Sequence, residues 1–178
     1  MPQNAQKLQL KAGLAYKIHH TAARGLPLAA QNNPTKFKVL VFDSGIFQRI
    51  LGLDLSEQIL NNFKLLINKG TLSEISVGLE LIAAFSPYSR PGLFYWHREA
   101  RSSNAEIDYV LSRGSLILPL EVKAGTRGQM QSLHLFLKER GLEKGLRISH
   151  ENFGTYDRIQ TLPLYAAGNV LRTDYFKG

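Results

Sequence analysis

EIDYVLSRGSLILPLEVKAG, residues 106–125, contains two strand-like runs joined by an Arg-Gly turn at 113–114. The second run is almost continuously apolar, which is typical of a central strand covered on both faces. Acidic residues interrupt both runs, Asp108 in the first and Glu121 in the second, with Lys123 two positions further on. The stretch therefore predicts a buried β-hairpin that carries charged side chains.

The segments on either side of this hairpin alternate between helical and strand-like patterns. We expect a helix at 71–85, a strand at 92–99 and, after the hairpin, a helix at 129–141 and a strand at 145–150. Three consecutive strands favour an antiparallel meander, and a strand that follows a helical crossover returns parallel to one of them. The sequence therefore predicts a mixed α/β fold with the order helix, three strands, helix, strand, followed by a strand at 158–165 and a short helix.

The N-terminal part of the chain has a different character. It predicts a helix at 5–13, strands at 14–23 and 37–43, and a helix at 44–53. A helix and two strands with a long connection fit a small winged-helix-like remnant. A capping Ser56 opens the next helix, so we divide the chain into an N-terminal segment, residues 1–55, and a main domain, residues 56–178.

Composition restricts the classes of function. The chain has 178 residues, of which 44% are hydrophobic, and it contains no cysteine, which excludes disulfides, zinc-thiolate sites and thiol nucleophiles and fits a reducing cytoplasm. No signal peptide or membrane-spanning run is expected. The net charge of +8 favours a polyanionic partner such as nucleic acid, although a merely basic soluble surface is the alternative.

Strand alternation sets the directions of the charged side chains. It places Glu121 and Lys123 on one face of their strand, and Glu106, Asp108 and Val110 on one side of theirs. If the hairpin closes at the Arg-Gly turn, Asp108 and Glu121 come close together, because neighbouring strands lie about 4.8 Å apart. A divalent cation such as Mg²⁺ relieves the repulsion between two such carboxylates by binding both. A metal site and a cluster of ion pairs both fit this pattern.

The order of these residues has a parallel in a known superfamily. Asp108 followed by EVK at 121–123 resembles the motif of the PD-(D/E)XK nucleases, whose restriction-endonuclease-like core has the helix, three-strand, helix, strand order. The chain is also similar, over about residues 10–171, to the C-terminal domain of unknown function of bacterial and archaeal AAA-type ATPases. The stretches that carry this likeness are SPYSRPGLFYWHREARSSNAEIDYVL at 86–111, LPLEVKAGTRGQMQSLHLFLKERG at 118–141 and GLRIS at 145–149.

The resemblance implies roles for individual residues. Asp108 and Glu121 would bind a Mg²⁺ or Mn²⁺ ion, and Lys123 would serve the water that attacks a phosphodiester bond. Nucleases of this superfamily often add an acid from the helix before the strands. We prefer Glu74 for that position over Glu80, because Glu74 fits the Gly-x-x-x-Glu spacing of recombination-type nucleases.

Residues near the motif are candidates for contact with DNA, the ligand that the resemblance implies. We expect Arg98, Arg101 and Arg127 to contact the DNA backbone. Arg127 lies just before a predicted helix start, a position that favours phosphate. Gln129 or Gln131 of that helix would approach the metal, as a glutamine does in some relatives.

Two further patterns have more than one interpretation. Tyr95 and Trp96 precede a His-Arg pair, so they are either a platform for stacking bases or part of the core. His19 and His20 are adjacent on a predicted strand, and their side chains therefore point to opposite faces, which argues against a shared metal ion.

The motor part of the resembled ATPases is missing from this chain. No G-x-x-x-x-G-K-[ST] motif occurs, so we expect no ATP site here and an AAA-type ATPase module as a partner. The leading prediction is a metal-dependent, nuclease-like DNA-binding domain. The alternative is a non-catalytic regulatory module of the same fold that binds DNA or protein.

Overall fold

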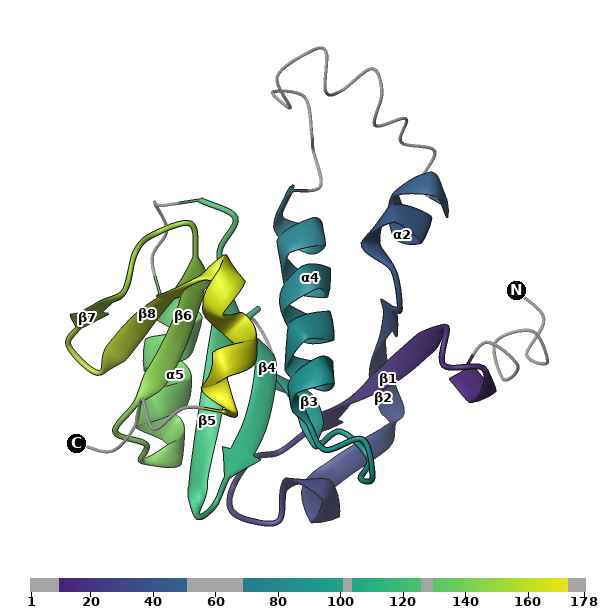
Figure 1. The fold of residues 1–178 in the computed structure, drawn as a ribbon. Coiled ribbons are helices and arrows are strands. Elements are labelled where there is room, and N and C mark those ends of the chain that lie inside the picture. Colours follow the sequence, from purple (N-terminus) through teal and green to yellow (C-terminus); the bar gives the residue numbers. More distant parts are fainter. Residues whose placement is uncertain (1–9, 51–68, 101–103, 126–129, 173–178) are drawn as a thin grey trace.

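The structure is a computed structural model that describes residues 10–50, 69–100, 104–125 and 130–172 (Figure 1). Residues 56–68 of the helix predicted at 56–70, and nearly all of the helix predicted at 5–13, lie outside these residues. Lys69 and Gly70, which were expected to end the first of these helices, instead begin the next one, Lys69–Ala84. The division of the chain at residue 55 also lies outside the described residues, so the separate N-terminal segment stays a prediction.

The strands in the described residues form one eight-stranded sheet with the order β2-β1-β3-β4-β5-β6-β8-β7. The strands are β1 (Ala15–Thr21), β2 (Asn32–Val41), β3 (Leu93–His97), β4 (Glu106–Arg113), β5 (Leu116–Val122), β6 (Gly145–Ser149), β7 (Gly154–Tyr156) and β8 (Ile159–Pro163). The helices are α2 (Ser44–Ile50), α4 (Lys69–Ala84), α5 (Gln131–Arg140) and the 3₁₀ helices η1 (Leu28–Gln31) and η2 (Leu164–Val170).

The central part of the sheet has the predicted topology. β3, β4 and β5 pair antiparallel as a meander, and β6 follows the α5 crossover and pairs parallel with β5. β5 lies between β4 and β6, as its almost continuous apolar run predicted. Gly114 forms the hairpin turn with φ of 57°, a left-handed conformation that favours glycine. The mixed α/β class and the order helix, three strands, helix, strand are therefore confirmed.

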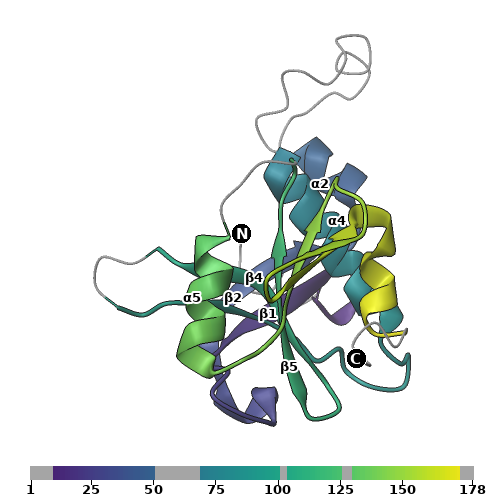
Figure 2. The ribbon, with the colours of Figure 1, turned by 90° about the vertical axis from the view of Figure 1, so that its left-hand side faces the viewer.

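Helices cover both faces of the sheet. Figure 2 shows α5 on one side and α4, with the C-terminal η2, on the other. On the α4 side, Val77 and Leu81 of the helix belong to a buried cluster with Leu120 of β5. On the α5 side, Leu133 and Phe136 pack in a second cluster with strand residues of β3 and β4. The sheet therefore separates two apolar cores, and a strand side chain belongs to one or the other according to its direction.

The N-terminal strands extend this same sheet. β1 pairs antiparallel with β2 and parallel with β3, so residues from the start of the chain lie beside the central meander (Figure 1). The helix predicted after these strands is present as α2, where the side chain of Asp43 accepts the backbone N–H of Ile46 at 2.9 Å. The winged-helix-like remnant stays a prediction.

Three short elements were not predicted: η1, β7 and the 3₁₀ form of the C-terminal helix. β7 has three exposed residues, too few to produce a readable alternation. Pro163 ends β8 and precedes η2, because proline cannot continue a ladder of backbone hydrogen bonds. None of the helices in the described residues is long and apolar enough to cross a membrane.

Candidate functional site

An extra residue in β4 re-aims the side chains of that strand. Phe94 of β3 pairs with Val110 and Trp96 pairs with Ile107, so the single residue between them on β3 faces two residues on β4, Asp108 and Tyr109. This is a β-bulge, and bulges redirect side chains. Strict alternation therefore fails at Asp108.

The bulge overturns one prediction about direction. Glu106, Asp108 and Val110 were expected on one side of β4, but Val110 packs in the core on the α5 side. Glu106 instead forms an ion pair with Lys38, which also contacts Glu74 of α4. Glu106 and Val110 therefore lie on opposite sides of the sheet.

Asp108 occupies the gap between β4 and β5. Its Oδ2 accepts the backbone N–H of Val122 at 2.7 Å. Burial, and after it the negative charges of Glu74 and Glu121, raise the pKa of this carboxyl to about 7, while the Val122 hydrogen bond and Lys38 oppose the rise. The site therefore holds a carboxyl group that is partly protonated near neutral pH.

Glu74 approaches Asp108 from α4. Lys38 Nζ lies 2.9 Å from Glu74 Oε1, and the Tyr109 hydroxyl donates to the backbone carbonyl of Glu74 at 2.8 Å. Tyr109 fits beneath the helix because Gly78 has no side chain: a Cβ there would lie 2.8 Å from the tyrosine ring. Of the two acids considered on α4, Glu74 is the one whose charge acts on Asp108. Glu80 lies instead near Gly168 of η2.

Glu121 and Lys123 form a second pair on β5. Leu120 and Val122 belong to the core on the α4 side, so Glu121 and Lys123 project toward the α5 side. Glu121 is buried, and its Oε1 lies 2.6 Å from Lys123 Nζ. Its Oε2 is buried and has no hydrogen-bond partner among the residues that the structure describes. Buried carboxylate oxygens usually have a hydrogen-bond partner, and an oxygen without one is available to bind a cation.

The predicted acids lie close enough to influence one another electrostatically, but they are not arranged as a complete set of ligands around one point. Asp108 responds to both Glu74 and Glu121, and Lys123 contacts Glu121 alone among these acids in the described residues. The three carboxylates do not have all their ligand atoms within 4.8 Å of one another. A cation shared by all three would require side-chain rotation.

The residues expected to contact DNA are only partly described. Arg98 pairs with Glu139 of α5 at 2.7 Å, and its backbone N–H donates to Ala105. Gln131 is exposed at the start of α5. Arg101, Arg127 and Gln129 lie outside the described residues, so their expected roles stay predictions.

The aromatic pair before Arg98 is part of the core. Trp96 is 2% exposed and packs edge-on against Phe136 of α5, with ring centroids 4.9 Å apart. Tyr95 is also buried, in the cluster on the α4 side. Neither ring is available as a stacking platform for bases, and the core interpretation is correct.

Sequence reasoning missed two residues that shape the site, Lys38 and Tyr109. Lys38 lies on β2, far from the motif in sequence, and its ion pairs with Glu74 and Glu106 link β2, α4 and β4. A single lysine in an otherwise apolar strand, FKVLVF at 37–42, was the available signal. Tyr109 directly follows Asp108, but only the bulge shows that it faces α4.

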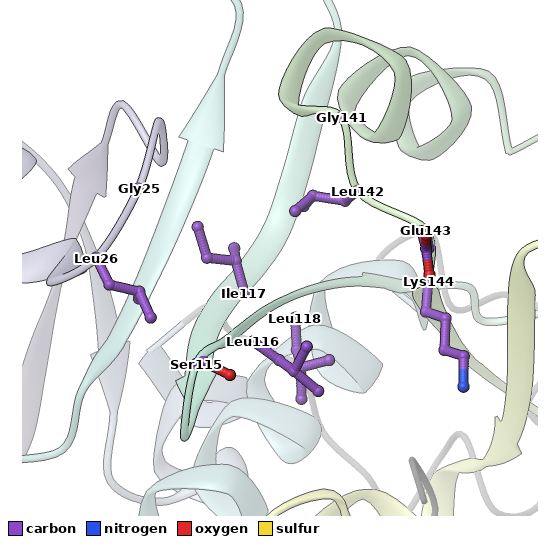
Figure 3. A pocket seen from close by; sticks show the side chains of 10 residues that line it. All are labelled: Gly25, Leu26, Ser115, Leu116, Ile117, Leu118, Gly141, Leu142, Glu143 and Lys144. Atoms are coloured by element: carbon purple, nitrogen blue, oxygen red, sulfur yellow. The ribbon is translucent and has the colours of Figure 1, made fainter. Parts of the chain in front are cut away.

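A cavity in the described part of the chain lies away from these acids. It has a volume of about 640 Å³ and is lined by residues at the β4–β5 turn and after α5. In Figure 3 the side chains of Leu26, Ile117 and Leu142 point into this space. Ser115 and Leu116 are at the turn end of the hairpin, whereas Asp108 and Val122 are at its other end, so the cavity is separate from the carboxylate site.

Comparison with known families identifies the part of the chain that contains this site. A family model described as a domain of unknown function, DUF4143, matches residues 69–167. The chain belongs to this family. The DUF4143 region begins at α4 and ends within η2, so it contains Glu74, Asp108, Glu121 and Lys123, whereas Lys38 lies outside it. The predicted likeness to a domain of unknown function is confirmed. No curated protein and no solved structure matches the chain.

Proposed function

We propose that this chain is a metal-dependent, nuclease-like domain that binds DNA and hydrolyses its phosphodiester bonds. One observation carries the proposal: Asp108 is buried between two strands near two other carboxylates, Glu74 and Glu121, and burial together with these two charges raises its pKa. Perturbed carboxyl groups of this kind are common at functional sites.

The residues present fit a divalent cation. Glu121 Oε2 is a buried acceptor with no donor in the described part of the chain, and Asp108 carries an unfavourable negative charge, so a cation near both would relieve both conflicts. The donors are carboxylate oxygens, which suit Mg²⁺ or Mn²⁺. Asp108 and Glu121 would hold the ion and Glu74 would support them. When bound, such an ion supplies a water of lowered pKa and neutralises charge on a phosphate.

The other residues of the site have roles that follow from their contacts. Lys38 holds Glu74 and Glu106 in place and keeps part of the negative charge of the site balanced. Lys123 pairs with Glu121 at 2.6 Å and is about one-third exposed, so it is placed to hold a water or meet the charge of a phosphate oxygen. In this proposal Lys123 is the residue that orients the attacking water.

The topology supports the same proposal. The order α4-β3-β4-β5-α5-β6, with β3–β5 as a meander and β6 parallel to β5, is the order of the restriction-endonuclease-like core of PD-(D/E)XK nucleases. We further propose that an AAA-type ATPase module is its partner, because the sequence resembles the C-terminal domain of such ATPases. The net charge of +8 supports DNA as the ligand.

The second candidate is a non-catalytic binding module of the same fold. The ion pairs favour it, because Lys123 already neutralises Glu121, and Lys38 already pairs with Glu74 and Glu106 and balances part of their charge. In this alternative the charged cluster joins α4 to the strands, and the basic surface binds DNA or a protein without cleavage.

Cleavage of DNA by matched variants separates the two candidates. Single- and double-stranded DNA would be incubated with Mg²⁺ and with the wild type, Glu121→Gln or Lys123→Met. The nuclease proposal expects metal-dependent cleavage that each variant reduces by at least about a hundredfold. Glu143→Gln, an exposed change near the distant cavity, is the control and should cleave like the wild type.

DNA binding is measured on the same proteins by fluorescence anisotropy. If no Mg²⁺-dependent cleavage occurs and DNA binding survives Glu121→Gln, the nuclease proposal is wrong and the binding module stands. If DNA binding is absent as well, both candidates that act on DNA are wrong.

A further inference from the structure

A second group of potential metal ligands contains none of the acids discussed so far, although His97 pairs in register with Glu106 of β4. His20, His97 and Glu99 each offer one ligand atom, and these three atoms all lie within 4.8 Å of one another. We propose that His20, His97 and Glu99 form a binding site for a divalent transition-metal ion, with Zn²⁺ as the first candidate. This site shares no residue with the carboxylate site and does not depend on the proposed nuclease function.

The parallel pairing of β1 and β3 creates this arrangement. His20, at the end of β1, pairs in register with Tyr95 of β3, and His97 follows two residues later on the same side of β3. The rings of His20 and His97 lie 4.6 Å apart, and Tyr95 packs against both. Sequence alternation correctly separates His19 from His20, but the second imidazole comes from another strand.

The donor set selects the class of metal. Two imidazole nitrogens and one carboxylate oxygen are typical ligands of Zn²⁺ and neighbouring first-row ions, whereas Mg²⁺ and Ca²⁺ prefer oxygen ligands alone. Three protein ligands also leave a fourth position for water or another ligand. The site would therefore take Zn²⁺ in preference to the Mg²⁺ expected at Asp108.

The geometry needs only a small contraction. Zn²⁺ bonds of roughly 2.1 Å in a tetrahedral arrangement place ligand atoms about 3.4 Å apart. The present separations are at most 4.8 Å, and Glu99 is exposed beyond the end of β3, so its side chain is free to move toward the rings.

The surroundings of His20 favour the tautomer and the neutral form of its ring that bind a metal ion. Its Nε2 lies 3.3 Å from the backbone carbonyl of His97, and because a carbonyl only accepts, Nε2 carries the proton and Nδ1 keeps its lone pair. A backbone carbonyl that fixes the tautomer of a histidine in this way is common around metal ligands. His20 is 5% exposed, and burial lowers its pKa, which favours the neutral ring that binds metals.

Lys36 competes with the metal for Glu99. Its Nζ lies 2.6 Å from Glu99 Oε1, but the two side chains are 41% and 58% exposed. Surface ion pairs of this kind contribute about 0–1 kcal/mol, so a metal ion held by two imidazoles displaces the lysine readily. Removing Lys36 should therefore strengthen metal binding, whereas removing Glu99 should weaken it.

Calorimetric titration with Zn²⁺ tests the site in the full chain, freed of any histidine tag and treated with chelator. We expect one equivalent of Zn²⁺ to bind, Glu99→Gln to weaken the affinity by at least about tenfold, and Lys36→Met to tighten it by up to about fivefold. Glu99 is exposed and Lys36 is partly exposed, so we expect both variants to keep the fold. Glu143→Gln, an exposed acid elsewhere, should leave the affinity unchanged.

A spectroscopic measurement tests the role of the histidines directly. Co²⁺ bound by two imidazoles and a carboxylate gives visible absorption bands, which His97→Gln should abolish. The proposal is overturned if no Zn²⁺ binds at concentrations up to about 100 µM, or if Glu99→Gln and His97→Gln bind Zn²⁺ like the wild type. Asp108→Asn should still bind Zn²⁺ like the wild type. A result that contradicts the nuclease proposal is therefore distinct from a result that contradicts this metal site.

Discussion

The side chain of Asp108 and the backbone N–H of Val122 are joined by a 2.7 Å hydrogen bond across the gap between β4 and β5. A carboxylate thus takes the place that a backbone carbonyl has in a regular ladder, next to the bulge at Asp108 and Tyr109. The hairpin is regular from its turn up to Tyr109 and Leu120, and its polar groups begin where this regular pairing ends. The position of the site therefore follows from a local break in the sheet.

The protonation of Asp108 should appear in the pH dependence of stability. Its pKa is raised to about 7 in the folded protein, above the pKa of an unfolded aspartate. At a pH between these two pKa values the folded state therefore binds more protons than the unfolded state. The free energy of unfolding should therefore fall as the pH rises toward 7, by up to about 1.4 kcal/mol per pH unit. Urea denaturation across this range measures the slope.

Asp108→Asn is the matched variant for this measurement, because the amide oxygen still accepts the Val122 N–H. It should be more stable than the wild type near pH 8 and similar to it near about pH 2–3, below the pKa of an unfolded aspartate, where Asp108 is protonated in both folded and unfolded states. Parallel stability curves for the two proteins would show that Asp108 does not titrate in this range.

Gly78 should be essential for the packing of α4. A Cβ at Gly78 would lie 2.9 Å from Leu40 Cδ2 and closer to the Tyr109 hydroxyl, so Gly78→Ala should destabilise the protein by about 1–3 kcal/mol. Gly70 is on the same helix, where an added Cβ would meet no atom of the described residues within 4 Å, and Gly70→Ala should stabilise the protein by up to about 1 kcal/mol. Equal effects in thermal denaturation would contradict the close contact.

Lys38 should contribute more to stability than Lys36. Lys38 pairs with Glu74 and Glu106 and also contacts the Tyr95 ring at 5.2 Å, whereas Lys36 pairs with Glu99 on the exposed surface. Lys38→Met should lower the free energy of unfolding by about 1–3 kcal/mol, because it leaves acids without their cation, and Lys36→Met by less than about 1 kcal/mol. The comparison is made by urea denaturation in the presence of chelator.

Removal of Lys38 should also change the pKa of Asp108. Lys38 lowers the pKa of Asp108, so Lys38→Met should move the pH-dependent change in stability to higher pH. An unchanged profile would indicate that the two groups are not coupled.

Arg98 gives a test of DNA binding that does not need cleavage. Glu139 pairs with Arg98 at 2.7 Å, and Glu139→Gln should release this arginine and tighten DNA binding by about two- to fivefold. The slope of log affinity against log salt should also steepen by up to about 0.9, the value for one additional phosphate contact. Glu143→Gln removes the same charge from the exposed surface and separates this effect from a change in net charge. Equal effects of the two variants would show that Arg98 does not contact DNA.

Local patterns predicted the central fold because they reflect burial. The apolar run of β5 and the glycine turn at Gly114 fixed the hairpin, and helical spacing located α4 and α5 around it. β7 and η1 were not predicted, because short elements have too few residues to show a period. The extension of the sheet by β1 and β2 depends on contacts between distant residues, which local patterns do not encode.

The candidate site was predictable in its residues and not in its geometry. The positions of Asp108, Glu121 and Glu74 follow from a motif, but the bulge that places both Asp108 and Tyr109 opposite a single residue of β3 adds one residue to β4 without a signal in composition. Lys38 enters the site only because β2 and α4 meet in space. The histidine group has the same origin, since His20 and His97 are 77 positions apart and parallel strand pairing brings them together.

The two outer strands of the sheet have a consequence for behaviour at high concentration. An open sheet presents unpaired backbone groups at its margins, which invite other chains to add strands and aggregate. β2 carries Pro34 and two lysines, Lys36 and Lys38, and β7 is only three residues long. The proline and the charges of β2, and the short length of β7, disfavour the addition of strands from other chains. The lysines that form the ion pairs therefore also protect the protein from self-assembly through its edge strands.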